Sequence, residues 1–120
     1  VYTDKGEPEF LAKDSVKKLQ DIRVHAAKYS DMNRPFGIFG TAIAGTWLSA
    51  ELQKPDQFFI DEDQSKKGQY HLEKRIYSPE EAPNGSNVYL PFEGKIGLAL
   101  FERLAHQSGI NFILTEGIET

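Results

Sequence analysis

The chain has 120 residues, of which 39% are hydrophobic, and its 14 basic and 18 acidic residues give a formal net charge of −4. This length and composition predict one folded domain, because the chain is too short for two ordinary domains. The acidic balance and the lack of basic runs longer than a pair argue against nucleic-acid and anionic-membrane partners. The sequence has no cysteine, which excludes disulfides, thiolate metal sites and cysteine nucleophiles.

The sequence also lacks the signals of membrane insertion and secretion. Its apolar stretches are far shorter than the roughly 20 residues that a membrane-spanning helix needs. No signal-peptide pattern is present. These features predict a cytoplasmic protein without a membrane partner. Because the sequence begins at Val1 and not at a methionine, we expect a fragment of a longer protein.

The N-terminal third predicts a polar lead-in followed by one long helix. Residues 1–10 are mostly polar and contain a glycine and a proline, so they are predicted as the lead-in. From residue 11 to residue 29, apolar side chains recur every three or four positions, which is typical of one face of an amphipathic helix. The polar segment 31–35 ends this helix at Pro35.

The remainder of the chain alternates short apolar runs with helix-compatible segments. Strands are predicted at 36–39, 57–60, 75–77, 87–92 and 110–114. Helices are predicted at 42–53 and 93–108, with a hydrophilic loop at 62–74 and a helical turn at 78–82. In that turn Ser78 is the expected N-cap, with Glu81 as the reciprocal acid of a capping box.

This alternation of strands and helices predicts an α/β fold. Short strands with few polar positions are typical of a parallel sheet that is covered on both faces. We therefore expect residues 11–120 to form a single Rossmann-like three-layer sandwich with a mostly parallel sheet of about five strands. Right-handed crossovers would bring the loops after the strands to one edge, where ligands of such sheets bind.

A glycine turn follows the first predicted strand. The segment Gly40-Thr41-Ala42-Ile43-Ala44-Gly45 keeps the first and last glycines of a dinucleotide-binding G-x-G-x-x-G pattern, and Asp61 lies 21 residues after Gly40, where a ribose-binding acid is expected. Gly40 can adopt a positive φ, and Gly45 permits close packing of helix on strand. Ala42, however, places a methyl group where a pyrophosphate would approach. A purely structural role for both glycines is the alternative.

Further candidate ligand-binding residues follow the second predicted strand. The acids Asp61-Glu62-Asp63 would repel phosphate but could hold sugar hydroxyls, and His71 lies in the loop at the same expected edge. Tyr70 and Tyr77 flank this region and could stack on a ring, although each could simply cover the end of the sheet. The three histidines are far apart in the sequence and show no metal-ligand spacing, so no metal site and no catalytic residue is predicted.

The order of these motifs resembles that of a known family. A strand, G-x-x-x-x-G, a helix, "FIDED", "KKG", "RIYSPEEAP" and "NVYLPF" follow one another as in the Rossmann-like C-terminal domain of sugar C-methyltransferases, which use S-adenosylmethionine. The resemblance covers about residues 11–118. The order is also similar to the nucleotide-binding module of polysaccharide-biosynthesis dehydratases and sugar O-acyltransferases.

The resemblance implies an accessory, non-catalytic domain that helps to position a nucleotide-sugar substrate. The family's zinc-binding cysteine cluster and its central methyltransferase domain have no counterpart in this sequence. S-adenosylmethionine would therefore belong to the parent protein, whose remaining domains are the expected partners. Gly40, Thr41, Gly45 and Asp61 match the family's loop and acid, whereas the family's loop lysine falls at Ala44.

Two other functions remain open from the sequence. One is an NAD(P)-dependent or nucleotide-sugar-binding domain of a polysaccharide-biosynthesis enzyme, against which the missing middle glycine argues. The Tyr-x-x-x-Lys spacing of such enzymes occurs at Tyr70 and Lys74, but in a predicted loop, and we interpret it as chance. The other is a docking module whose sheet edge binds a neighbouring domain without any ligand.

Overall fold

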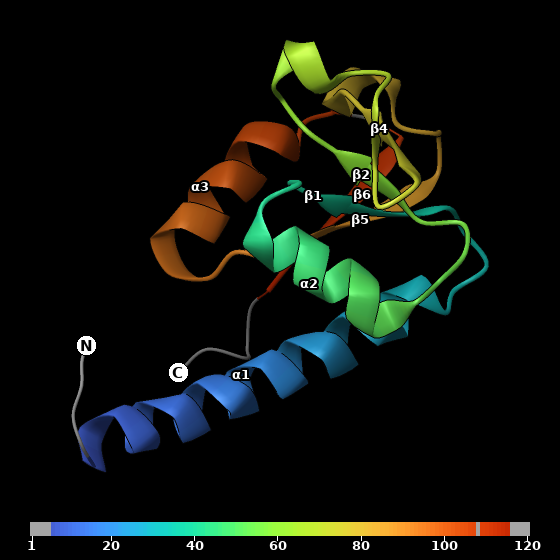
Figure 1. The fold of residues 1–120 in the computed structure, drawn as a ribbon. Coiled ribbons are helices and arrows are strands. Elements are labelled where there is room, and N and C mark those ends of the chain that lie inside the picture. Colours follow the sequence, from blue (N-terminus) through green and yellow to red (C-terminus); the bar gives the residue numbers. More distant parts are fainter. Residues whose placement is uncertain (1–5, 108, 116–120) are drawn as a thin grey trace.

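A computed structural model describes residues 6–107 and 109–115, which form an α/β fold (Figure 1). Its helices are α1 (Gly6–Ser30), α2 (Ile43–Leu52) and α3 (Gly94–Leu104). Its strands are β1 (Phe36–Phe39), β2 (Phe58–Ile60), β3 (Tyr70–His71), β4 (Lys74–Tyr77), β5 (Ser86–Leu90) and β6 (Ile110–Leu114). Two short 3-10 turns complete the described elements, η1 (Gln64–Lys66) and η2 (Pro79–Glu81).

The strands form one sheet in the order β3-β4-β2-β1-β5-β6. All neighbouring pairs are parallel except β3 and β4, which are antiparallel. From β1 the chain first adds β2 and β4 on one side, and it then crosses to the other side to add β5 and β6. The order therefore reverses between β1 and β5, which is the switch point where ligands of open parallel sheets bind.

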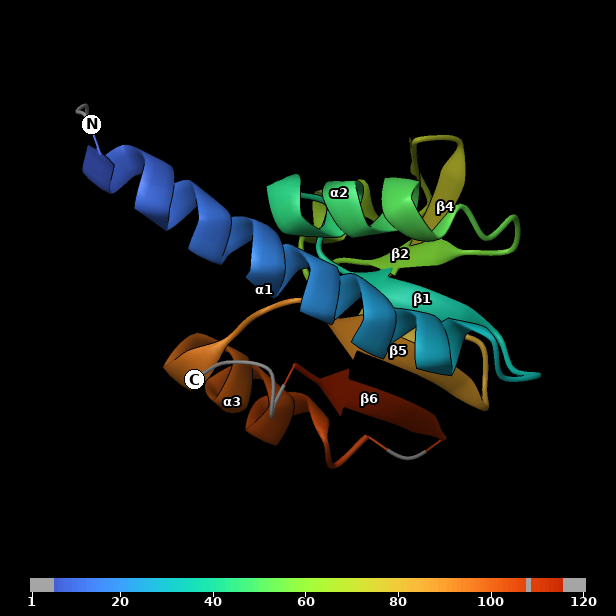
Figure 2. The ribbon, with the colours of Figure 1, turned by 90° about the horizontal axis from the view of Figure 1, so that it is seen from below.

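Helices cover both faces of this sheet, as Figures 1 and 2 show, with α1 and α2 on one face and α3 on the other. Two cores result from the alternation of side chains along the strands. Phe36, Ile38 and Phe59 belong to the cluster under α1 and α2, while Phe39 and Ile60 belong to the cluster under α3. The architecture is compatible with a Rossmann-like sandwich.

The predicted α/β class with a mostly parallel sheet is confirmed, although the sheet has six strands and not about five. The five parallel strands lie where they were predicted to within two residues. The end of β5 was placed too late: the strand stops at Leu90, because Pro91 cannot donate a ladder hydrogen bond. The predicted lead-in was too long, since α1 begins at Gly6. Pro8 is compatible with this start because a proline is tolerated in the first turn of a helix. Residues 1–5 of the lead-in lie outside the described residues.

The sequence did not predict the β3–β4 hairpin, which occupies the end of the supposed loop 62–74. Leu72 and Glu73 connect the two strands, with φ values of 51° and 65°. Positive φ at both central residues is the requirement of a type I′ hairpin turn, which usually carries Asn-Gly or Asp-Gly. Because leucine and glutamate rarely adopt this conformation, the sequence contained no signal for the turn.

The elements on either side of β5 also differ from their predictions. The predicted helical turn is the 3-10 turn η2. Ser78 is its N-cap residue, as predicted, but the Ser78 side chain makes no capping hydrogen bond. Helix α3 spans 94–104 and not 93–108. Helix propensity alone disfavours a glycine such as Gly97 within a helix. A Cβ atom there would lie 2.2 Å from the carbonyl oxygen of Phe92, so the glycine allows α3 to begin directly against the preceding loop.

One further finding concerns membranes. Among residues 6–107 and 109–115, no helix has the length and the apolar character required to cross a bilayer.

Candidate functional site

The glycine turn lies at the switch point of the sheet, between β1 and α2. Gly40 has a φ of 98°, and its N–H donates a hydrogen bond of 2.7 Å to the carbonyl of Ile60. A Cβ atom at Gly45 would lie 2.1 Å from the carbonyl oxygen of Gly40. Both predicted roles are confirmed: Gly40 adopts a conformation that other residues avoid, and Gly45 lets α2 start against the end of β1.

The N-terminus of α2 faces this turn without a side-chain cap. Ala42 is the N-cap residue and has no side-chain acceptor, and its carbonyl accepts from the N–H of Thr46 at 3.0 Å. The first N–H groups of a helix have no partner within the helix. An uncapped start therefore leaves donors and the positive end of the helix dipole available to an anionic group.

A polar cluster connects the turn to the loop after β2. The hydroxyl of Thr41 donates to Oδ2 of Asp61 at 3.0 Å and accepts from Nζ of Lys66 at 3.1 Å. Nζ of Lys66 lies 3.6 Å from Oδ2 of Asp61, whose side chain is only 16% exposed. The candidate ligand-binding residues Thr41 and Asp61 are thus in direct contact, although they are 20 residues apart.

His71 belongs to the same cluster through the first turn of α2. Its Nε2 lies 2.7 Å from the hydroxyl of Thr46, which is also 3.3 Å from the carbonyl oxygen of Thr41. The direction of this hydrogen bond is set by the tautomer of the imidazole: Nε2–H donates to the hydroxyl in one tautomer, and Nε2 accepts from it in the other. The imidazole also packs edge-to-face against Phe59, with ring centroids 5.0 Å apart.

The three consecutive acids after β2 have three different partners. Asp61 contacts Thr41 and Lys66, whereas Glu62 forms an ion pair with Arg103 of α3. Asp63 caps η1 by accepting from the N–H and the hydroxyl of Ser65 at 3.0 and 2.8 Å. These hydrogen bonds hold the pKa of Asp63 below its usual value. Asp63 therefore serves η1, and only its N–H, 2.9 Å from Oδ1 of Asp61, supports the cluster.

An apolar groove of about 410 Å³ lies on the other side of the α2 N-terminus. Its volume falls within the range of roughly 300–1,000 Å³ that is typical of small-molecule sites. Ile43 and Ala44 of the glycine turn form one of its walls, and Ile43 is 87% exposed. The other lining residues are Leu19 and Ile22 of α1, Trp47 of α2, and Pro91 after β5. The start of α2 thus separates a polar cluster from an apolar groove.

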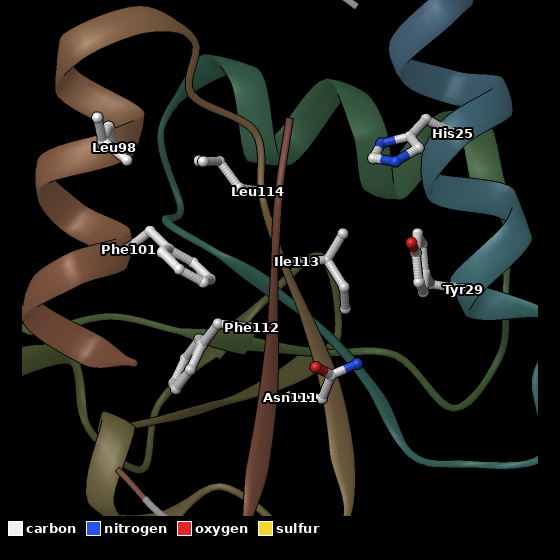
Figure 3. Close-up of a pocket in the computed structure, with 8 residues that line it drawn as sticks. All are labelled: His25, Tyr29, Leu98, Phe101, Asn111, Phe112, Ile113 and Leu114. Atoms are coloured by element: carbon white, nitrogen blue, oxygen red, sulfur yellow. The ribbon is translucent and has the colours of Figure 1, made fainter. Parts of the chain in front are cut away.

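A second cavity, of about 280 Å³, follows the edge strand β6. Figure 3 shows its lining side chains on both sides of this strand, with α3 on the left and α1 on the right. Nδ1 of His25 lies 2.8 Å from the hydroxyl of Tyr89, and the two rings meet edge-to-face. Burial raises the pKa of Tyr89 to about 12, and this effect outweighs a hydrogen bond with Thr115.

The two predicted stacking tyrosines lie in different environments. Tyr77 packs edge-to-face against Phe58, with centroids 5.4 Å apart, so it covers the core under α3. Tyr70 is 66% exposed on β3 and has room to contact a ring.

Two residues of the cluster, Thr46 and Lys66, were not predicted. Lys66 lies in a hydrophilic "KKG" segment that resembles any solvated loop. Nothing in the sequence indicates which of its two lysines contacts the glycine turn. Within residues 6–107 and 109–115, no group of three or more metal-ligating side chains is placed to hold a metal ion. Comparisons with protein-family models, curated proteins and solved structures returned no match.

Proposed function

We propose that this chain is an accessory, non-catalytic Rossmann-like domain of an S-adenosylmethionine-dependent methyltransferase, and that it binds a nucleotide or nucleotide-sugar substrate at the glycine turn. The observation that carries the proposal is the position of this turn. It lies at the switch point of the sheet, with hydrogen-bonding side chains on one side and an apolar groove on the other. This is the place where ligands of open parallel sheets bind.

The arrangement supports a ligand that lies across the start of α2. The phosphate groups would face the uncapped helix N-terminus near Ala42. Sugar hydroxyls would bond to Thr41 and Asp61, whose oxygens already exchange a hydrogen bond with each other. The apolar groove would take the less polar part of the ligand, such as a base or a deoxysugar. The methyltransferase context rests on the motif order described above, with S-adenosylmethionine bound elsewhere in the parent protein.

A second candidate function is docking of the remaining domains of the parent protein without a ligand. Its support is a set of exposed apolar side chains on the segments of α1, α2 and α3 near the end of the sheet where the parallel strands end. Their exposed fractions are large: Val16 51%, Leu19 40%, Ile43 87%, Ile96 73% and Leu98 48%. Figure 2 shows the first turns of α1 projecting past this end of the sheet. Exposed apolar side chains that adjoin one another are typical of interaction surfaces.

A thermal-shift titration distinguishes these functions. The panel is S-adenosylmethionine, NAD, NADP and several nucleotide sugars. At a tenfold excess over its dissociation constant, a nucleotide sugar is expected to add about 1.4 kcal/mol to the free energy of unfolding. Thr41→Val, which removes the hydroxyl between Asp61 and Lys66, should reduce this gain. Asn33→Ala, at the opposite edge of the sheet, is the matched control and should preserve it.

The other outcomes are equally informative. A response to NAD or NADP alone would replace the proposal by a nicotinamide-dependent enzyme domain. No response to any nucleotide, combined with association with other domains of the parent protein, would leave the docking module.

A further inference from the structure

The electrostatic balance at the glycine turn differs from what the sequence indicated. Three acids in a row were expected to repel phosphate, but Glu62 pairs with Arg103 and Asp63 caps η1. Asp61 is the acid that contacts the turn, and the charges of both Asp61 and Asp63 interact with Lys66. Lys66 lies 3.6 Å from the carboxylate of Asp61 and balances its charge.

The two neighbouring lysines of this loop have equal exposure but different partners. Both side chains are 44% exposed. Nζ of Lys67 is 3.0 Å from the carboxylate of Glu81, on η2. Nζ of Lys66 instead reaches the glycine turn, where it donates to Thr41. The two residues thus form a natural pair in which only one ammonium group faces the candidate site.

Lys66 also has hydrogen-bonding capacity to spare. An ammonium group carries three N–H donors. In the part of the chain that the structure describes, one of them is used in a hydrogen bond, to Thr41 at 3.1 Å. The 3.6 Å contact with Asp61 is longer than a hydrogen bond and is an ion contact only. The ammonium group can therefore bind a further acceptor without leaving the cluster.

We propose that Lys66 binds the phosphate groups of the ligand and so selects a phosphorylated ligand over its uncharged counterpart. In the free protein, Thr41 and Asp61 hold the ammonium group beside the turn. Lys66 thus brings a positive charge from the loop after β2 to the glycine turn. This inference rests on the proposed function, because it assigns the ligand class of the same site.

The test measures binding of three probes to the 120-residue chain by calorimetric titration: inorganic pyrophosphate, a nucleoside diphosphate sugar and the matching nucleoside. Lys66→Gln removes the charge with little change in shape, and Lys67→Gln is the control at the neighbouring position. We expect Lys66→Gln to weaken binding of both phosphorylated probes by about tenfold, as for the loss of one charge-assisted hydrogen bond. Lys67→Gln should change these affinities by less than about twofold, since the ion pair it removes is exposed.

The outcomes separate this inference from the proposed function. Equal binding of the diphosphate sugar by both variants and the unchanged chain would overturn the role of Lys66 while leaving the proposed function standing. Binding of pyrophosphate that depends on Lys66, with no affinity for nucleotides, would support Lys66 and contradict the proposed function. Absence of binding of all three probes would overturn both. Thermal unfolding of each variant checks that the fold is retained.

Discussion

Replacing Gly45 with alanine is expected to destabilise the domain by about 3 kcal/mol. The new Cβ atom would lie 2.1 Å from the carbonyl oxygen of Gly40, and backbone atoms on both sides fix this distance. Relief of the clash would require α2 to move away from the end of β1. Helix propensity alone predicts the opposite sign, because alanine is favoured over glycine within a helix by about 1 kcal/mol. Urea unfolding of the two chains measures the difference.

Gly68→Ala is the control for this prediction. Gly68 has a φ of +82°, but a Cβ atom there has nothing within 4 Å. The free energy of unfolding of the Gly68→Ala variant should therefore fall only by the roughly 1–2 kcal/mol that a left-handed backbone conformation costs. A Gly45→Ala chain that is as stable as the original, or more stable, would show that α2 does not start against the strand in the way described.

The free energy of unfolding should fall by about 2 kcal/mol between pH 9 and pH 12 through Tyr89 alone. Burial raises the pKa of Tyr89 from 10.0 to about 12. Above pH 10 the unfolded chain loses this phenolic proton while the folded chain keeps it, so alkaline pH favours unfolding. The stabilisation is complete below pH 10 and disappears as the pH rises through the folded pKa.

Tyr89→Phe should remove this part of the alkaline destabilisation. The substitution deletes the titrating hydroxyl and its contact with Nδ1 of His25, at a cost of about 1 kcal/mol at neutral pH. Unfolding midpoints measured from pH 8 to pH 12 give the comparison. Tyr70→Phe, at a position that is 66% exposed, is the control and should follow the unchanged chain. Parallel pH profiles for Tyr89→Phe and the unchanged chain would contradict the buried environment of Tyr89.

The elements that the sequence predicted correctly are those with a local cause. Buried parallel strands have continuous apolar runs, as in Phe36–Phe39, and therefore stand out in the sequence. The positive φ of Gly40 also follows from a pattern, that of a strand–turn–helix unit. The same pattern places Asp61 after the next strand, at the edge of the sheet where the turn lies, although the hydrogen bond between Thr41 and Asp61 was not predicted.

The features that the sequence did not predict depend on tertiary contacts. The β3–β4 hairpin turns at Leu72 and Glu73, where the surrounding structure overrides the preference of both residues for negative φ. Helix propensity disfavours Gly97 within α3, whereas the carbonyl of Phe92, which approaches it closely, requires a glycine there. The contact of Lys66 with the glycine turn and that of Lys67 with η2 depend on where Thr41 and Glu81 lie. Neither contact can be read from the order of residues.

The central claim is that the glycine turn at the switch point binds a nucleotide or nucleotide sugar. The most direct measurement is a map of backbone amide chemical shifts of the chain during titration with a nucleotide sugar. The account predicts that the largest changes occur at residues 40–46, at Asp61 and at Lys66, with smaller changes along the groove at Leu19 and Trp47. Changes confined to the cavity beside β6, or no changes at saturating ligand, would contradict it.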